Sequence, residues 1–156
     1  FDGVDDILQA TQETSLYNNA HAIFNVAELL SSPTAADYIS GGFNNTSTNR
    51  ERIAFGAFNR QASNPSYITS GNSLITALYS GVSSGGLQSP FVNGVAQTTA
   101  NETTTFTDLD EFDIGGSLDF SRFTNANIQE IIVYNSDQSA NRAAIETNIN
   151  NHYDIY

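Results

Sequence analysis

The sequence contains no cysteine, methionine or tryptophan, and its five basic residues are all arginines. Without cysteine there is neither a disulfide framework nor a thiolate metal site, so packing and strand pairing must stabilise the fold. Seventeen acidic residues give a formal charge of -12 at pH 7, which disfavours contact with nucleic-acid phosphates and anionic lipid surfaces. No apolar run approaches the length of a bilayer span. We therefore expect neither nucleic-acid binding nor membrane insertion.

Hydrophobic residues instead recur with a period of two, which is typical of β-strands. Alternation runs through Ala20–Ala27, and short apolar runs follow at Tyr38-Ile39, Ile53–Phe55 and Leu74–Val82, separated by glycine, asparagine, proline and serine clusters. Asn93-Gly94 is the strongest hairpin signal, because a type I′ turn needs positive φ at both central residues. Regularly spaced short strands predict an all-β fold, and no internal repeat divides the chain.

The segment from Asn127 to Tyr134 predicts a strand near the end of the sequence. Alternation places four side chains on one face: Ile128, Glu130, Ile132 and Tyr134. Gln129, Ile131 and Val133 fall on the other face, so both faces are apolar from Ile131 onward. A strand that is apolar on both faces needs a covering layer on each side.

One short helix is predicted after this strand, near residues 137–151. Ser136 or Asp137 is a suitable cap, and the interior is rich in alanine, glutamate and arginine. Ile145, Ile149 and Tyr153 recur every four residues and form a narrow apolar stripe. The stripe predicts that the helix packs on the outside of a sheet.

Four segments carry a resemblance to a known family: FDGVDDIL at 1–8, PFVNGVAQ at 90–97, FDIGGSLDF at 112–120 and the whole of 128–156. They resemble the concanavalin A-like, laminin-G-like jelly-roll modules, most of all those in tail and other structural proteins of marine bacteriophages. The resemblance implies an antiparallel sandwich of two sheets with one C-terminal helix, as a single domain over residues 1–156. In those modules the FDGVDD segment follows a stretch that supplies its partner strand, so we expect an N-terminal segment of a longer chain upstream.

The same resemblance implies a structural and recognition role in a virus particle, as part of a phage tail, fibre or capsid decoration. The expected location is the virion surface or another extracellular setting. The expected partners are other virion subunits, copies of this chain in a homo-oligomer, and a glycan on a cell surface. A secreted bacterial module for carbohydrate binding or adhesion is the alternative, and a glycoside hydrolase is a less favoured one.

Two features argue against hydrolysis. The related catalytic domain of arabinofuranosidases has an aspartate acid in a Gly-Gly-Asp motif, whereas this chain reads Gly115-Gly116-Ser117 at the matching place. The Glu-x-Asp-x-x-Glu strand of another hydrolase type is absent. Glu130 remains as a candidate acid because its strand is apolar. The favoured interpretation is that it pairs with an arginine, such as Arg122 or Arg52, or sits at the solvated end of the strand. We expect no enzymatic activity and assign no catalytic residue.

Polar and aromatic side chains of the expected loops are the candidates for glycan binding: Tyr38, Asn44, Asn45, Tyr67 and Asn72. Amides form hydrogen bonds with sugar hydroxyls, and sugar faces stack on aromatic rings. Because tryptophan is absent, tyrosine or phenylalanine must provide the stacking. The alternative is that these loops contact neighbouring subunits.

Two acidic stretches are candidates for calcium (Ca2+), the one cofactor that the sequence suggests. Asp2, Asp5 and Asp6 open the chain, and Asp108 and Asp110 begin its densest acidic stretch. Calcium takes six to eight oxygen ligands, and a single loop rarely supplies all of them. Turn formation at the first group and a solvated acidic loop at the second are therefore the favoured interpretations.

Overall fold

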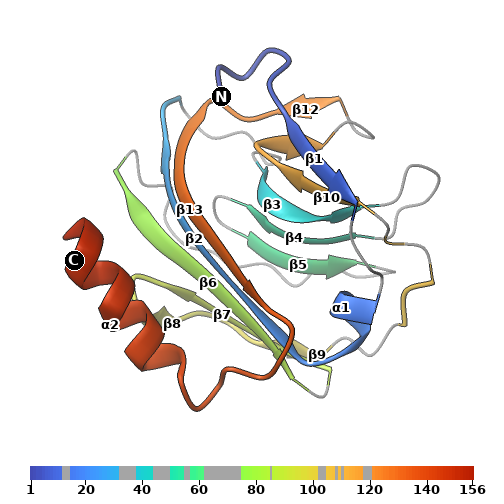
Figure 1. Cartoon of the computed structure of the whole chain (residues 1–156), viewed down its shortest axis with the longest axis vertical. Helices are drawn as coiled ribbons and strands as arrows, with labels where there is room; N and C mark the ends of the chain where they lie inside the picture. The colour runs from blue at the N-terminus through green and yellow to red at the C-terminus, as the bar shows by residue number, and fades with distance from the viewer. Residues whose placement is uncertain are drawn as a thin grey trace.

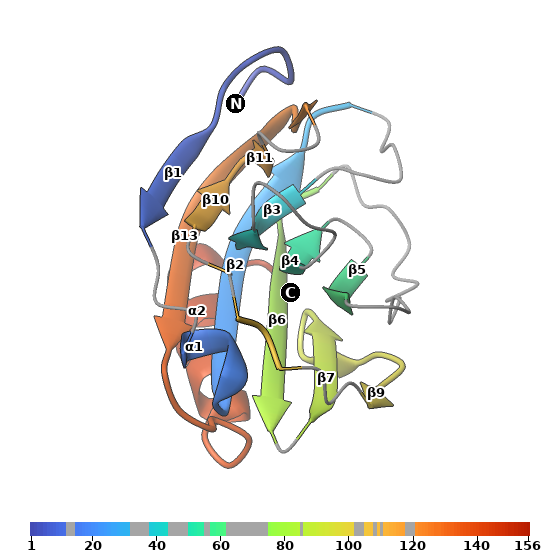
Figure 2. The ribbon, with the colours of Figure 1, turned by 90° about the vertical axis from the view of Figure 1, so that its right-hand side faces the viewer.

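The computed structural model describes residues 1–11, 15–31, 38–43, 50–54, 57–61, 75–84, 86–101, 105–107, 109, 111–117 and 121–156. These residues form two antiparallel β-sheets that face each other, with a C-terminal helix outside them (Figure 1). Figure 2 shows the same two layers after a quarter turn. The predicted class, an all-β sandwich of two sheets with one C-terminal helix, is confirmed.

The larger sheet has six strands. Its order is β13 (Ala126–Tyr134), β2 (His21–Leu29), β6 (Ala77–Ser84), β7 (Leu87–Val92) and β8 (Val95–Ala96), with β9 (Ala100–Asn101) also paired to β7. All of these pairs are antiparallel. The last strand of the sequence, β13, therefore pairs with an early strand and forms an edge of the sheet.

The second sheet has five strands, in the order β1 (Leu8–Thr11), β10 (Glu111–Ile114), β3 (Tyr38–Phe43), β4 (Arg50–Ala54) and β5 (Ala57–Gln61). The remaining elements are a short ladder of β11 (Gly116–Ser117) with β12 (Arg122–Phe123), helix α1 (Ser15–Asn18) and helix α2 (Arg142–Tyr153). In Figure 1, α2 lies on the face of the larger sheet that points away from the five-stranded sheet.

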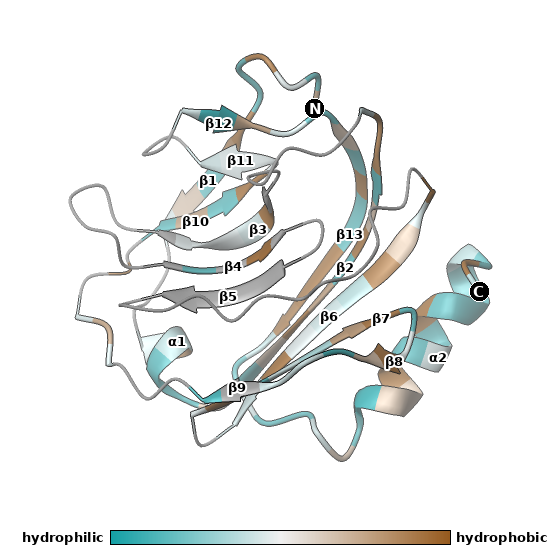
Figure 3. Ribbon diagram, turned by 180° about the vertical axis from the view of Figure 1, so that it is seen from behind, coloured by the Kyte–Doolittle hydropathy of each residue, from teal (hydrophilic) through white to brown (hydrophobic). Residues whose placement is uncertain are grey.

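Two hydrophobic clusters occupy the two faces of the larger sheet. β2 is buried along nearly all of its length, and its alternation serves both clusters. Ile23, Ala27 and Leu29 pack between the sheets, whereas Phe24 and Val26 pack toward α2. Figure 3 shows hydrophobic residues gathered on β2, β6 and β13 and mostly polar residues on α2. Full burial of one such side chain stabilises the fold by about 1.5–3 kcal/mol.

β13 has apolar contacts on both faces, although Val133 is 38% exposed, and the predicted alternation is wrong at Ile128. The register with β2 shifts at Gln129, which is the extra residue of a β-bulge. Ile128 and Ile131 consequently pack between the sheets, while Ile132 and Tyr134 pack toward α2. One extra residue moves every later side chain to the other face, which is why Ile128 does not share the face of Ile132.

The Asn93-Gly94 turn forms the predicted hairpin between β7 and β8. Its φ values are 49° at Asn93 and 75° at Gly94, so both central residues have the positive φ that a type I′ turn needs. The Asn93 side-chain oxygen also accepts a hydrogen bond from the Leu78 amide at 2.8 Å. This bond ties the turn to the neighbouring strand β6.

Helix α2 begins later than predicted. Its first residue is Arg142, and the preceding Asn141 makes no side-chain capping hydrogen bond. Neither Ser136 nor Asp137 caps the helix. The Asp137 carboxylate instead accepts hydrogen bonds from the Ser139 hydroxyl and amide and from the Ser84 hydroxyl, which fold the loop before the helix. These bonds, those from Ser139 first, lower the pKa of Asp137. Because this carboxylate is engaged in the loop, helical structure starts several residues further on.

The predicted apolar stripe of α2 is confirmed. Ile145, Ile149 and Tyr153 pack on the outer cluster of the larger sheet, and Ile149 is 3% exposed. The helix ends at Tyr153, and the next residue, Asp154, caps it with left-handed backbone angles and donates its amide hydrogen to the Asn150 carbonyl. In the described part of the chain, no helix combines the length and the apolar character that crossing a membrane requires.

Candidate functional site

The predicted glycan-binding loops fall almost wholly outside the described residues. Asn44, Asn45, Tyr67 and Asn72 lie outside them, and Tyr38 begins β3 but its side chain is not described. Their role in binding stays a prediction. A site supported by geometry has to be built from the side chains that the structure does describe.

The first predicted calcium group comes together at the surface. Asp2, Asp5 and Asp6 are exposed, and their carboxylate oxygens lie within 4.8 Å of one another. Asp6 accepts a hydrogen bond from the Asp2 amide at 3.0 Å, and Asp2 accepts one from the Val4 amide at 2.8 Å. These bonds fit the favoured interpretation that the acids form a turn. Asp108 and Asp110 lie outside the described residues.

A polar cluster lies buried between the two sheets. His21 Nε2 on β2 contacts the Glu51 carboxylate on β4. His21 Nδ1 lies 2.8 Å from the Asn19 carbonyl oxygen, which only accepts hydrogen bonds, so Nδ1 carries a proton. The Tyr17 ring meets His21 edge-on, with ring centroids 5.8 Å apart. Burial, followed by the charges of Glu51 and Asp113, raises the pKa of Tyr17 well above 10.0.

This cluster joins the sheets and is closed to ligands. Tyr17, His21 and Glu51 are each 0% exposed, so a ligand reaches them only if the sheets separate. Gly42 passes so close to Tyr17 that an added Cβ would lie 2.3 Å from its ring. Ser117, which stands where the arabinofuranosidase motif has its acid, is equally buried in β11. We interpret these groups as parts of the folded core.

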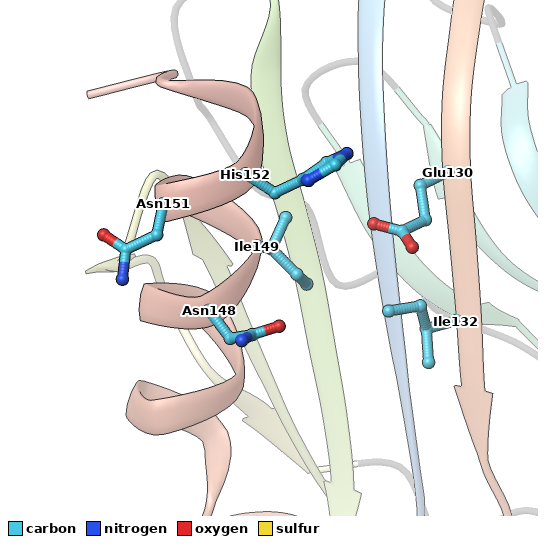
Figure 4. Close-up of a pocket in the computed structure, with 6 residues that line it drawn as sticks. All are labelled: Glu130, Ile132, Asn148, Ile149, Asn151 and His152. Carbon is cyan, nitrogen blue, oxygen red and sulfur yellow. The ribbon is translucent and has the colours of Figure 1, made fainter.

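An open groove lies between α2 and β13, and we call it the helix groove. Its described lining residues come from both elements: Glu130, Ile132, Asn148, Ile149, Asn151 and His152. Figure 4 shows Glu130 and Ile132 extending from β13 toward the helix, and His152 and Ile149 extending from α2 toward the strand. The cavity volume is about 460 Å³. Small-molecule sites commonly measure roughly 300–1,000 Å³.

The helix groove combines hydrogen-bonding groups with an apolar floor. Glu130 is half-buried and is the one carboxylate among the described lining residues. The His152 imidazole and the Asn148 amide add donors and acceptors. Ile132 and Ile149 supply the apolar part. The groove therefore suits a small ligand that has both polar groups and an apolar face.

Sequence reasoning identified Glu130 but missed its surroundings. Among the side chains that the structure describes, Glu130 forms no ion pair, and the predicted partner Arg122 is exposed on β12. The side chain of Arg52 is not among those described. His152 and Asn148 were missed because their spacing of four shows only that they share a helix face. Their proximity to the predicted Ile149 stripe was the signal that could have found them.

Comparison with known proteins gives structural neighbours only. No protein-family model matches the chain, and no sequence among the curated proteins matches it. A sialidase from Trypanosoma rangeli, in complex with sialic acid, has a TM-score of 0.67 at 13% identity, over 92% of this chain and 26% of that chain. Domain 4 of AbnA, a GH43 extracellular arabinanase from Geobacillus stearothermophilus, in complex with arabinotriose, has a TM-score of 0.61 at 12% identity, over 83% of this chain and 66% of that chain.

Identities this low show a shared fold and nothing more. The chain spans about a quarter of the sialidase that it matches. Together with the two sheets described above, these neighbours define the chain as a β-sandwich domain of a kind that also occurs in a sialidase and an arabinanase. They do not show a link to bacteriophage particles.

Proposed function

We propose that this chain is a non-catalytic module that binds a glycan through the helix groove. The β-sandwich fold supports the proposal, because one neighbour with this fold is an arabinanase domain in complex with arabinotriose. The observation that carries the proposal is the groove itself. Glu130, His152 and Asn148 offer the partners that sugar hydroxyls need, beside an isoleucine floor that suits the C–H face of a sugar ring.

The distribution of carboxylates supports a non-catalytic role. A glycosidase of the common two-carboxylate type needs two carboxyl groups about 5 to 10 Å apart around the scissile bond. Of the described residues that line the helix groove, only Glu130 is an acid. Ser117 replaces the acid of the arabinofuranosidase motif and is buried. Among its described lining residues, the helix groove therefore lacks the second carboxylate of such a pair, which supports a binding role.

For the biological context, we propose a structural and recognition module at the surface of a virus particle, assembled as a homo-oligomer with other virion subunits. The resemblance of the four segments to phage tail and structural modules supports this context. Mass spectrometry of purified virions and light scattering of the isolated chain test it. Presence of the chain in bacterial culture medium and its absence from particles would favour a secreted adhesion module.

A glycan array, probed with and without calcium, tests the binding function. We expect binding to at least one class of glycan, weakened about tenfold by His152→Ala, which removes a hydrogen-bonding group from the groove. Thr147→Ala changes an exposed residue on the same helix and is the matched control. A calcium requirement would favour the Asp2, Asp5 and Asp6 group as ion ligands.

Two results would contradict this proposal. If no glycan binds under either condition, the chain is not a glycan-binding module. If the chain releases reducing sugar from a polysaccharide, and Glu130→Gln abolishes the release at an unchanged melting temperature, the chain is a hydrolase.

A further inference from the structure

A second groove adjoins the helix groove at the end of α2, and we call it the C-terminal groove. Its described lining residues are Ile75, Thr76, Gln129, His152, Tyr153, Asp154 and Ile155. Its volume is about 500 Å³. His152 lines both grooves, so the two cavities meet at this imidazole. A ligand that contacts both grooves must pass this side chain.

The bulge in β13 explains how two consecutive residues serve two neighbouring grooves. In a regular strand, Gln129 and Glu130 would point to opposite faces of the sheet. The extra residue at Gln129 interrupts this alternation, and Gln129 lines the C-terminal groove while Glu130 lines the helix groove. Re-aiming a side chain is a common role of bulges beside functional sites.

The two grooves offer complementary chemistry. In the C-terminal groove, Ile75 is 61% exposed, and Tyr153 and Ile155 are half-buried. The Tyr153 and His152 rings meet edge-on, with centroids 4.7 Å apart. This apolar surface suits the C–H face of a sugar ring. Glu130 in the helix groove suits hydroxyl groups instead.

Both grooves carry negative charge. Glu130 lies in the helix groove, and Asp154 lies in the C-terminal groove. Burial, followed by the charge of Glu130, raises the pKa of Tyr153 above 10.0. The described lining residues include no arginine, and the chain has a formal charge of -12. A carboxylated sugar would be repelled from such a surface.

Building on the proposed function, we propose that the two grooves form one site for a neutral oligosaccharide of at least two sugar units. One ring places its hydroxyls against Glu130 in the helix groove. The next ring rests on Tyr153 and Ile75 in the C-terminal groove, and His152 lies between the two. Sugars that carry a carboxylate, such as sialic and uronic acids, are excluded by Glu130 and Asp154.

The test compares neutral and acidic sugars of different length by calorimetry and NMR titration of the full chain. The neutral probes are arabinotriose, xylotriose, cellotriose and mannotriose with their monosaccharides, and the acidic probes are trigalacturonate and 3′-sialyllactose. We expect at least one neutral trisaccharide to bind about tenfold more tightly than its monosaccharide and to shift the amide signals of Asn148 and Thr76. The acidic probes should bind at least about tenfold more weakly than that trisaccharide.

Variants separate the roles of the two grooves. Tyr153→Leu should weaken the affinity for the trisaccharide about tenfold. The affinity for the monosaccharide should stay within about threefold of the parent value, because only the longer ligand reaches this ring. If Tyr153→Leu loosens the helix, Ile75→Ser repeats the test at an exposed position of the same groove, with the same expected affinities. Glu130→Gln keeps the side-chain shape and removes the charge, so affinity for the acidic probes should rise about tenfold. Thr147 is not a lining residue of either groove, so the control variant Thr147→Ala should change none of these affinities.

Different results would overturn different parts of this inference. Tight binding of trigalacturonate or 3′-sialyllactose in the two grooves would refute the neutral-sugar assignment and leave the proposed function intact. A trisaccharide that binds no more tightly than its monosaccharide, or that shifts signals in one groove only, would refute the two-groove site. Failure of every glycan to bind would instead refute the proposed function.

Discussion

Among single residues, Glu146 is the acid that the fold buries beneath α2. Its carboxylate accepts a hydrogen bond from the Ser80 hydroxyl at 2.5 Å and contacts Arg142. The Arg142 guanidinium in turn lies 3.8 Å from the centre of the Phe91 ring. Burial raises the pKa of Glu146 above its ordinary value of 4.5, against the opposing effects of Ser80 and Arg142. The folded protein therefore holds this proton at a pH where the unfolded chain has released it.

The raised pKa of Glu146 predicts the sign of a pH dependence. The stability that the protonated carboxyl contributes is present below the unfolded-state pKa and is lost as the pH rises through the folded-state pKa. We therefore expect Glu146→Gln, which cannot ionise, to gain stability relative to the parent between about pH 4 and pH 7. Urea unfolding at each pH measures this difference. Glu28→Gln, on the partly exposed end of β2, is the control.

A constant stability difference between Glu146→Gln and the parent over that pH range would contradict the prediction. The neighbouring charged and titratable groups are Arg142 and Tyr156, and the pKa of Tyr156 is raised by burial and then by Glu146. Tyr156 does not titrate in this range, because its pKa lies above 10.0. The measured slope therefore reports on Glu146 itself.

Sequence alone did not single out Glu146, and the reason is physical. Its spacing of four from Arg142 is typical of an ion pair on an exposed helix surface. Its burial depends on Ser80 of β6, which is 66 residues away in the sequence. Glu130, by contrast, was identified because the apolar character of its strand is visible in adjacent residues. Local environments are predictable, whereas environments made by distant strands are not.

Among the secondary-structure elements, α2 depends on its apolar stripe. Ile149 is 3% exposed and belongs to the cluster beneath the helix. Truncation of a packed aliphatic side chain leaves a cavity, so Ile149→Ala should lower the free energy of unfolding by about 2–5 kcal/mol. Thr147→Ala, on the exposed side of the same helix, should change it by less than about 0.5 kcal/mol. Urea unfolding followed by circular dichroism measures both, and equal effects of the two variants would mean that α2 is not docked.

The elements that follow from adjacent residues were predicted well. The Asn93-Gly94 hairpin and the Ile145, Ile149 and Tyr153 stripe depend on local turn chemistry and helical period, and both are confirmed. The start of α2 and the face of Ile128 were wrong. Each depends on a partner that is distant in the sequence. The start of α2 depends on Ser84, which contacts the Asp137 loop, and the face of Ile128 depends on the pairing of β13 with β2.

For the molecule as a whole, the buried contact between His21 and Glu51 links the two sheets. β2 belongs to one sheet and β4 to the other. Glu51→Ala removes the carboxylate that faces the buried imidazole, so we expect a loss of about 3–5 kcal/mol in the free energy of unfolding. Glu28→Ala removes an acid from the partly exposed end of the same strand as His21 and should cost less than about 1 kcal/mol. Equal losses for the two variants would show that this contact does not hold the sheets together.

The two grooves of the candidate site could not be predicted from the sequence, because they depend on how the whole molecule packs. Ile75, Gln129 and His152 line one groove, yet they come from a position before β6, from β13 and from α2. No periodicity within one segment shows that three such segments meet. The all-β class was predictable because the strands repeat a local pattern, and the two-sheet arrangement was expected from the family resemblance. The grooves were not predictable because they are produced by packing.

The pairing of β13 with β2 also determines the order in which the chain can fold during synthesis. Glu28 and Asn127, which meet across this ladder, are 99 residues apart in the sequence. β2 therefore leaves the ribosome long before β13 and α2, the elements that cover its edge and one of its faces. Non-local strand pairing is slow, and apolar strands that await a partner are prone to aggregate. We therefore expect the yield of folded protein to depend on how long β2 waits for β13, in addition to the stability of the finished sandwich.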